Sequence, residues 1–196
     1  MTQHDERIAA AVHAPGLPPQ PWRNGAGVTR EIAAAPGGGE AGFAWRLSLA
    51  DLEADAPFSP FPGVERVHVP VQGRPYVLTV DGHERVARVG EPLRFSGGAE
   101  VAVALGGGGG RRRALNLMVA ASAGTGCVGV IGPADTPMAT GVEVVAVAVV
   151  EGAAELRDGR RLGPLDVLLT DSLPVEVTRL TGQAALVRVR PRRAAG

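Results

Sequence analysis

A run of polar and conformationally free residues, PWRNGAGVTREI, occupies positions 21–32. Its amide residue, Asn24, stands beside glycines that can adopt positive φ and bring backbone N–H groups close to a ligand. The second half of the run alternates with the period of a β-strand, which places Thr29 and Glu31 on one face. These residue types suit the recognition of a small polar molecule. A plain turn that enters a strand has the same pattern, so spacing alone leaves both interpretations open.

Guanidinium and amide groups recur further along the chain. The segment FAWRLSL alternates as a strand in which Arg46 and Ser48 lie opposite an apolar face made by Phe43, Trp45, Leu47 and Leu49. If the face with Arg46 looks into a barrel, the guanidinium needs an ionic partner, either a carboxylate ligand or Glu31. Arg66, which follows the turn FSPFPG, is a second candidate for the carboxylate. Asn116 is a candidate for an amide or formyl group of the same ligand.

The composition narrows the classes of partner. Twenty basic residues, all of them Arg, balance twenty acidic ones. Because the net charge is zero, we expect no nucleic-acid partner and no anionic membrane surface. The one basic cluster, Arg111–Arg113, follows five glycines, which predicts a solvated loop rather than a phosphate site. The lone Cys127 excludes an intrachain disulfide and lacks the setting of a nucleophile. The first residues lack a signal-peptide pattern, so we expect a cytoplasmic protein.

The elements that must position these groups are mostly short strands. Glycine and proline, 28 and 16 residues, punctuate short runs rich in Val and Leu. Strands are predicted at 43–49, 101–105, 142–150 and 175–177. A helix is plausible only near residues 4–12 and 50–55.

The segments that begin at Val71 and Val150 resemble each other. Each contains a strand, an Asp-Gly turn at Asp81–Gly82 or Asp158–Gly159, and a returning strand. An Asp-Gly pair suits a type I′ hairpin because both central residues need positive φ. The repeat predicts two small β-domains, barrels or sandwiches, that pack together with their edges covered.

Three motifs together resemble the HutD/Ves family: PWRNGAGVTREI, the segment FAWRLSLADLEADAPFSPFPGVER at 43–66, and ALNLMV at 114–119. They occur in the family's order and at suitable spacing. The resemblance implies an all-β, double-stranded β-helix of the cupin (RmlC-like jelly-roll) type, a bicupin with two β-barrel lobes in one chain. One unit would cover 1–196, with an N-terminal lobe at 15–120 and a degenerate C-terminal repeat at 121–196.

The family is associated with histidine utilisation, and its members are thought to bind a small catabolite. The resemblance therefore implies a small anionic metabolite as partner, such as N-formylglutamate or a related intermediate, and a regulatory or accessory role more than an enzymatic one. We expect the three motifs to line one cavity. Its predicted ligand-binding residues are Trp22, Asn24, Gly25, Gly27, Thr29, Glu31, Arg46, Ser48, Phe58, Phe61, Arg66 and Asn116. One departure is Ala114, where the family often has an acidic residue. If that acid supports an Arg of the pocket, this pocket is altered.

A metal or another cofactor is not expected. Cupin metal sites commonly use two closely spaced His, a Glu and a later His, whereas the stretch VHVPVQG offers only His68. The other histidines, His4, His13 and His83, lie in the N-terminal tail or after the Asp81–Gly82 turn. His68 is therefore predicted to be a strand histidine whose place keeps a pocket role open.

Two alternatives to the binding function stay open. One is a metal-independent cupin enzyme, an isomerase, lyase or hydrolase, that uses Glu31 or His68 as general base. The other is a scaffold that acts on another enzyme or a transcription factor. The sequence also leaves a homodimer open.

Overall fold

The computed structural model describes residues 9–37, 41–107, 109–170 and 173–192. Within these ranges the chain is all-β, with antiparallel strands and two short 3-10 turns, η1 (Ala14–Gly16) and η2 (Pro133–Asp135). None of the helical segments among the described residues has the length and hydropathy that a membrane-crossing helix needs.

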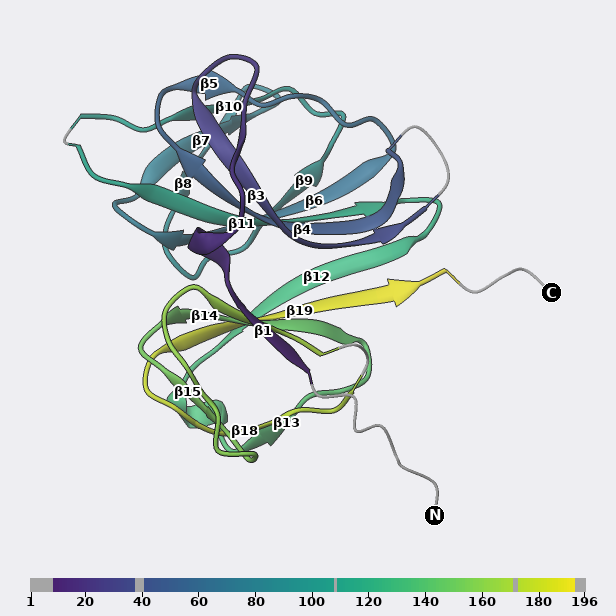
Figure 1. The fold of residues 1–196 in the computed structure, drawn as a ribbon. Coiled ribbons are helices and arrows are strands. Elements are labelled where there is room, and N and C mark those ends of the chain that lie inside the picture. The colour runs from purple at the N-terminus through teal and green to yellow at the C-terminus, as the bar shows by residue number, and fades with distance from the viewer. Residues whose placement is uncertain (1–8, 38–40, 108, 171–172, 193–196) are drawn as a thin grey trace.

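Two sheets built from the first part of the chain face each other, and we call them the N-terminal sheet pair (Figure 1). The six-stranded sheet is ordered β2 (Gln20–Pro21), β3 (Gly27–Pro36), β4 (Phe43–Leu52), β11 (Arg112–Ala120), β6 (Val64–Gln72) and β9 (Leu93–Ser96). The four-stranded sheet is ordered β5 (Ala56–Pro57), β10 (Val101–Ala104), β7 (Tyr76–Val80) and β8 (His83–Ala87). The core between them includes Leu52, Tyr76, Leu78, Phe95 and Val103.

The remaining strands form the C-terminal sheet pair. Its five-stranded sheet is ordered β1 (Ala10–His13), β17 (Asp166–Leu169), β14 (Val144–Glu151), β19 (Gln183–Pro191) and β12 (Gly124–Ile131). Its four-stranded sheet is ordered β13 (Met138–Ala139), β18 (Glu176–Leu180), β15 (Ala154–Leu156) and β16 (Arg161–Leu162). Although β1 opens the described chain, it pairs with β17 and so belongs to this second pair.

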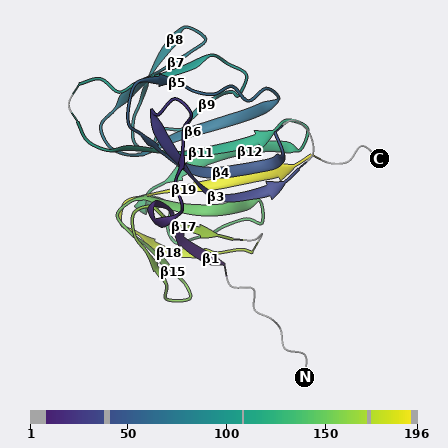
Figure 2. The ribbon, with the colours of Figure 1, turned by 45° about the horizontal axis from the view of Figure 1, so that its top comes forward.

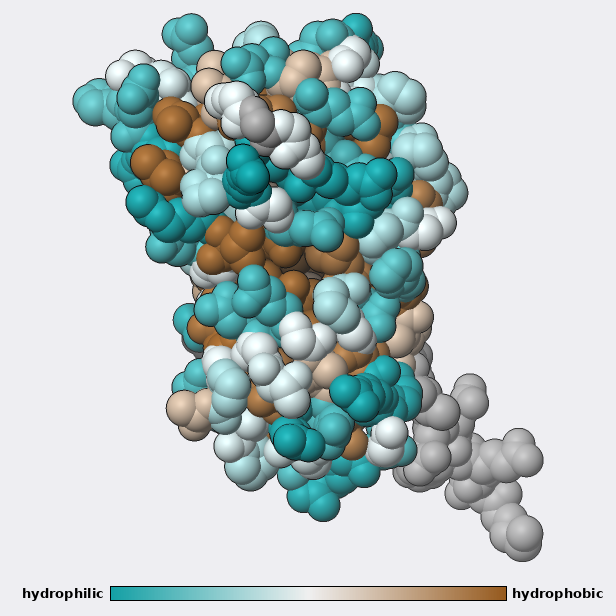
Figure 3. Space-filling view, turned by 90° about the vertical axis from the view of Figure 1, so that its left-hand side faces the viewer, coloured by the Kyte–Doolittle hydropathy of each residue, from teal (hydrophilic) through white to brown (hydrophobic). Residues whose placement is uncertain are grey.

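The five-stranded and six-stranded sheets pack against each other through one apolar core, which joins the two pairs (Figures 1 and 2). Leu47 and Leu49 of β4 and Leu117 of β11 meet Ala146 and Val187 of the other sheet in this core. Figure 3 shows hydrophobic side chains gathered in a band at the level where the pairs meet. Because side chains alternate along a strand, the residues between these leucines point into the N-terminal sheet pair.

A buried ion-pair triad links the neighbouring strands β3, β4 and β11, and its three side chains lie on one side of the sheet. The two carboxylate oxygens of Asp51 accept hydrogen bonds from Arg113 Nε at 2.6 Å and from Arg30 Nη1 at 2.7 Å. The side chain of Asp51 is only 8% exposed. Arg113 also donates to Gln72 on β6, so the triad ties four strands of the six-stranded sheet together.

Most expected elements are found, and the exceptions have local causes. All four predicted strands are present as β4, β10, β14 and β18, with small shifts at their ends. The helices expected near 4–12 and 50–55 are wrong within the described chain, because residues 10–13 form β1 and 50–52 complete β4; residues 4–8 lie outside the described residues. Val-rich and alternating segments gain more from sheet pairing than from a helix.

Two further expectations are corrected in detail. Arg112 and Arg113 are not in a solvated loop: they begin β11 and are 4% and 6% exposed, and Arg111 alone is exposed. Phe43 does not join Trp45, Leu47 and Leu49, because a register shift next to Pro36 lets it pack with Val64 and Met118 instead. The Asp81–Gly82 turn is confirmed, since both residues have positive φ, 47° and 79°, whereas the type I′ turn at Asp158–Gly159 is wrong, because only Gly159 has positive φ.

Candidate functional site

The inner face of the six-stranded sheet carries a row of polar side chains, which we call the polar row. Glu31 on β3 is opposite Ser48 on β4, Ser48 is opposite Asn116 on β11, and Asn116 is opposite His68 on β6. Directly opposed residues of antiparallel strands have Cβ atoms about 4.5–5.5 Å apart, so these groups are neighbours. Ser48, Asn116 and His68 are 2%, 5% and 0% exposed, whereas Glu31 lies at the exposed end of the row.

The next row on the same face, the arginine row, holds two guanidinium groups. Met118 on β11 lies between Arg46 on β4 and Arg66 on β6, and Phe95 on β9 follows Arg66. The alternation that predicted Arg46 opposite Leu47 and Leu49 is confirmed, because the leucines enter the core between the pairs. The two rows together bring one carboxylate, one amide, one hydroxyl, one imidazole and two guanidinium groups to one patch.

Arg66 is buried and forms no ion pair with the residues that the structure describes. The residue is 6% exposed, and its Nε has no hydrogen-bond acceptor among the described residues. Its guanidinium carbon lies 5.2 Å from the ring centroids of Phe58 and Phe95 and 5.9 Å from that of Phe61. Burial, and secondarily the charge of Arg46, lowers the pKa of Arg66 to about 10. Aromatic faces attract the cation but accept no strong hydrogen bond, so its donors remain available.

Arg46 is half-buried and has a similar set of contacts. It donates to Met118 Sδ at 3.3 Å and lies over the rings of Phe43 and Phe61, at 5.2 and 5.6 Å. Its Nε has no partner within the described chain. Burial lowers the pKa of Arg46, and the nearby charge of Glu31 opposes that shift. Glu31 is thus an electrostatic neighbour of Arg46, but no ion pair forms between them among the described residues.

His68 is engaged at both ring nitrogens. Nδ1 lies 2.9 Å from Asn116 Oδ1, and Nε2 lies 2.5 Å from the hydroxyl of Tyr76. Burial lowers the pKa of His68 to about 4; the hydrogen bond to Asn116 opposes this shift, and the charge of Arg66 adds to it. His68 is accordingly neutral at physiological pH. The interpretation of His68 as a strand histidine fits this setting.

The lowered pKa of His68 predicts how stability depends on pH. The unfolded chain takes up a proton near pH 6.5, whereas the folded chain keeps His68 neutral down to about pH 4. The part of the free energy of unfolding that comes from the neutral imidazole is therefore fully present above pH 7. It falls by about 2–3 kcal/mol as the pH drops from near 6.5 toward 4. Urea unfolding of wild type and His68→Gln from pH 4.5 to 7.5 measures it. We expect the wild type to lose more stability than the variant on acidification; parallel curves would contradict the prediction.

Trp22 forms an aromatic wall beside the polar row. Its Nε1 donates to Thr29 Oγ1 at 2.8 Å, and its ring lies edge-on to Phe58 at 5.7 Å. Phe58 in turn lies 5.9 Å from the imidazole of His68. Trp45 packs on the other side of the sheet, against the core between the pairs, and lines an apolar cavity of about 520 Å³ with Val119 and Val142.

Asn24 and its neighbouring glycines have local roles in a turn and in packing. Asn24 Oδ1 accepts a hydrogen bond from the N–H of Ala26, and its Nδ2 donates to the carbonyl of Pro57. Gly25 has φ of +69°, as a turn requires. Gly27 lies so close to β4 that a Cβ would stand 2.4 Å from the carbonyl oxygen of Asp51. The structure therefore gives these three residues turn and packing roles, and their contact with a ligand stays a prediction.

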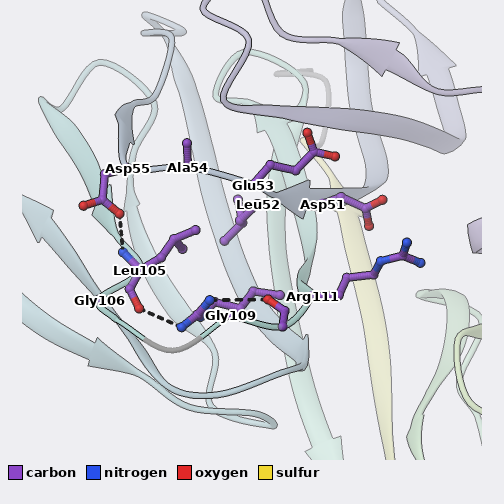
Figure 4. Close-up of a pocket in the computed structure, with 11 residues that line it drawn as sticks. Asp51, Leu52, Glu53, Ala54, Asp55, Leu105, Gly106, Gly109 and Arg111 are labelled. Carbon is purple, nitrogen blue, oxygen red and sulfur yellow. Dashed lines mark hydrogen bonds between the residues drawn. The ribbon is translucent and has the colours of Figure 1, made fainter.

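A cavity of about 500 Å³ opens at the end of β4, lined by Leu52, Glu53, Asp55 and the glycine run (Figure 4). Arg112 holds this run by donating to the carbonyls of Leu105 at 2.8 Å and Gly110 at 3.4 Å. Asp55 accepts from the N–H of Leu105 at 2.7 Å. These bonds join the loop to β11 and to the segment after β4, and the buried Nε of Arg112 has no hydrogen-bond partner among the described residues.

Ala114 lies on the inner face, between Ala50 and Pro70 in register and next to the polar row. Its side chain is fully buried and brings no carboxylate to the arginines. In the described ranges no group of three or more His, Cys, Asp or Glu is placed to hold a metal ion. Cys127 is exposed on β12.

Three members of the site were not among the predicted residues: Tyr76, Phe95 and Met118. Tyr76 is the single tyrosine of the chain and begins the strand before the Asp81–Gly82 turn. Period-two alternation with Leu78 would have placed it inward. No local sequence pattern predicts that Phe95 lies next to Arg66, because the register between β6 and β9 brings them together.

The paired antiparallel sheets and the polar patch inside one pair define a cupin-like all-β protein. The cupin 2 conserved barrel domain protein from Leptotrichia buccalis has the same fold, with a TM-score of 0.62, 12% identity and coverage of 95% of this chain and 99% of that chain. The chain belongs to the HutD family, whose model matches residues 14–187. The resemblance seen in the three motifs is thereby confirmed.

Related proteins agree with this assignment. The structure of HutD from Pseudomonas fluorescens SBW25, in a formate condition, is similar with a TM-score of 0.80 and 31% identity over 94% of this chain and 99% of that chain. An uncharacterized 21.2 kDa protein in the hutC 3′ region of Pseudomonas putida is 41% identical over 48% of this chain and 50% of its own. Protein Ves of Citrobacter koseri is 38% identical over 45% and 47%. The chain thus spans about half the length of the curated relatives it matches.

Proposed function

We propose that the polar and arginine rows bind a small carboxylated metabolite and that the protein has a regulatory or accessory role. The observation that carries this proposal is the buried guanidinium of Arg66, whose Nε has no hydrogen-bond partner and which forms no ion pair with any residue that the structure describes. Removing a charge from water without a partner costs several kcal/mol. A ligand carboxylate would accept two parallel N–H bonds from a guanidinium and offset that cost.

The groups around Arg66 favour an anionic ligand over a cationic one. Within the described ranges, the two rows hold two guanidinium groups and one carboxylate, that of Glu31, which is exposed and forms no ion pair with either arginine. Ser48 and Asn116 add neutral polar groups on the side of the patch nearest the arginines. The rings of Phe58 and Phe61 give the patch apolar walls, a combination that is typical of small-molecule sites.

We further propose that the two sheet pairs are two cupin barrels, so that the chain is a bicupin with one working site. The core of the C-terminal pair consists of Val, Leu and Ala side chains such as Val147, Leu168 and Leu186. The polar residues buried in that half are Thr140 and Thr170, and each bonds to backbone within it. A polar ligand therefore finds its partners in the N-terminal pair.

The names of the relatives suggest which acids to test. One relative is named for the hutC 3′ region, and the HutD structure from Pseudomonas fluorescens is titled with a formate condition. Formate is the smallest carboxylate, and N-formylglutamate carries carboxylates and a formyl group. We propose N-formylglutamate or a related intermediate of histidine catabolism as the ligand, and the cytoplasm as the place of action.

The enzymatic alternative receives less support. His68 has both ring nitrogens in hydrogen bonds, so it has no free lone pair with which to take a proton from a substrate. Glu31 remains as the candidate base, at the exposed end of the polar row.

Calorimetric titration with formate, glutarate, N-formylglutamate and urocanate tests the proposal, with dimethyl glutarate as the uncharged control. We expect at least one acid to bind and the diester to bind about 100-fold more weakly than glutarate, because charge-assisted hydrogen bonds are worth about 1.5–3 kcal/mol each. Equal binding of acid and ester, or no binding of any acid, would contradict it. Product analysis of the same mixtures gives the second outcome: turnover that Glu31→Gln abolishes would favour the enzyme.

A further inference from the structure

Tyr76, His68 and Asn116 form a buried hydrogen-bonded chain that ends beside the two arginines. We infer that Tyr76 and His68 are positioning residues that hold the amide NH₂ of Asn116 toward the ligand, so that the site selects a ligand with an acceptor at this place and rejects one with a donor. The part that concerns the ligand rests on the proposed function. The part that concerns the imidazole is a property of the unliganded protein and is tested separately.

First, the three side chains are close enough to form two consecutive hydrogen bonds. The hydroxyl of Tyr76 lies 2.5 Å from His68 Nε2, and His68 Nδ1 lies 2.9 Å from Asn116 Oδ1. All three side chains are at least nine-tenths buried. A neutral imidazole has one donor nitrogen and one acceptor nitrogen, so a single choice of tautomer sets the direction of both hydrogen bonds.

The second step is to account for donors. If Nδ1 carries the proton, His68 donates to Asn116 Oδ1 and Tyr76 donates its O–H to Nε2, so each of the two hydrogen bonds has one donor and one acceptor. If Nε2 carries the proton, it donates to the oxygen of Tyr76, and that hydroxyl has no acceptor among the described residues. A buried donor without an acceptor costs about 1–3 kcal/mol. The tautomer protonated at Nδ1 is therefore preferred.

The third step is the charge around the chain. Arg66 lies in the adjacent row, and Arg112 lies close enough to affect the ionisation of Tyr76. Burial raises the pKa of Tyr76, and Arg112 opposes the rise, so the hydroxyl keeps its proton. A protonated imidazole would be a third cation next to these arginines. Burial and positive charge together keep His68 neutral and the chain in one direction.

The fourth step concerns Asn116. Because its Oδ1 accepts from His68, its Nδ2 points away from the imidazole, and no described residue accepts a hydrogen bond from that nitrogen. Ser48 stands opposite Asn116, and the arginine row is the next row along β11. The donors of Asn116, Arg46 and Arg66 thus lie on one patch. A carbonyl or carboxylate oxygen fits there, whereas an ammonium group would face two guanidinium groups, with only the hydroxyl of Ser48 and the carboxylate at the exposed end of the polar row as acceptors.

The ring ¹⁵N chemical shifts of His68 in the ligand-free protein test the first part. We expect Nδ1 to be protonated and Nε2 to be unprotonated at pH 7. The signals of His68 are identified by their loss in His68→Gln. A protonated Nε2 would overturn the inference whether or not any ligand binds. In Tyr76→Phe, we expect the ring to populate both tautomers, since the donor to Nε2 is gone.

Ligand selectivity tests the second part. Glutarate and 4-aminobutyrate differ at one end, where a carboxylate is replaced by an ammonium group, and wild type should prefer glutarate. Tyr76→Phe should reduce this preference about tenfold, which corresponds to one hydrogen bond of about 1.4 kcal/mol, without lowering the melting temperature below the assay range. Thr79→Val, a change on the same strand away from the chain, is the control and should leave the ratio unchanged.

The outcomes separate the inference from the proposed function. An unchanged ratio in Tyr76→Phe, with glutarate still bound, would overturn the inference and leave carboxylate binding intact. Failure of wild type to bind glutarate or any other acid would contradict the proposed function and the selectivity that rests on it. A protonated Nδ1 in that case would still support the positioning of Asn116 by His68.

Discussion

Replacement of Arg66 by methionine is expected to weaken glutarate binding about 100-fold or more while leaving the melting temperature unchanged or higher. The expected loss follows from removing a bidentate, charge-assisted contact worth about 3 kcal/mol or more. Stability behaves differently because Arg66 is buried without an ionic partner among the described residues, and an apolar side chain of similar length avoids the desolvation penalty. Calorimetry and thermal unfolding of the same preparation measure both quantities.

The matched control is Arg94→Met. Arg94 lies on β9 opposite Val67, its side chain is 53% exposed, and its partner is the surface residue Glu65. This variant should bind glutarate as wild type does. Arg66→Lys should bind with intermediate affinity, since lysine keeps the charge but not the planar pair of donors. If Arg66→Met binds as tightly as wild type, Arg66 is not the carboxylate partner.

Asp51→Asn is expected to lower the free energy of unfolding by about 3–5 kcal/mol, because it leaves two buried guanidinium groups without their counter-charge. Arg113 and Arg30 both depend on Asp51, at 2.6 and 2.7 Å. Their side chains are 7% and 14% exposed, so water compensates poorly. Urea unfolding at neutral pH measures the loss.

Glu65→Gln is the control for this prediction. It removes the partner of Arg94 from an exposed ion pair, whose side chains are 53% and 41% exposed. Such pairs contribute about 0–1 kcal/mol, so this variant should unfold close to wild type. A loss below about 1 kcal/mol in Asp51→Asn would mean that Arg30 and Arg113 find other acceptors or water, and would remove the triad as a source of stability.

The parts of the fold and site that follow from local pattern could be predicted from the sequence. Alternation in FAWRLSL was enough to place Arg46 opposite Leu47 and Leu49, and an Asp-Gly pair was enough for the hairpin at Asp81. The motif resemblance brought Arg66 and Asn116 into the same site. These inferences use neighbours within a few residues or the motifs of a known family, so they do not require the register between strands.

What could not be predicted depends on register between distant segments. Arg112 and Arg113 follow five glycines, which look like a loop, but β11 begins there because β4 and β6 supply partners on both sides. The aromatic surroundings of Arg66 are likewise assembled from three segments. The second hydrogen bond of Asn24 likewise goes to Pro57, a residue far along the chain.

The pairing of β1 with β17 has a consequence for synthesis on the ribosome. Residues 10–13 leave the ribosome long before their partners at 166–169. Until those partners are available β1 has no strand to pair with, and closing so long a loop is slow compared with forming a hairpin. We therefore expect β1 to stay unpaired during synthesis until β12 and β14 have already emerged, because β17 follows both of them along the chain.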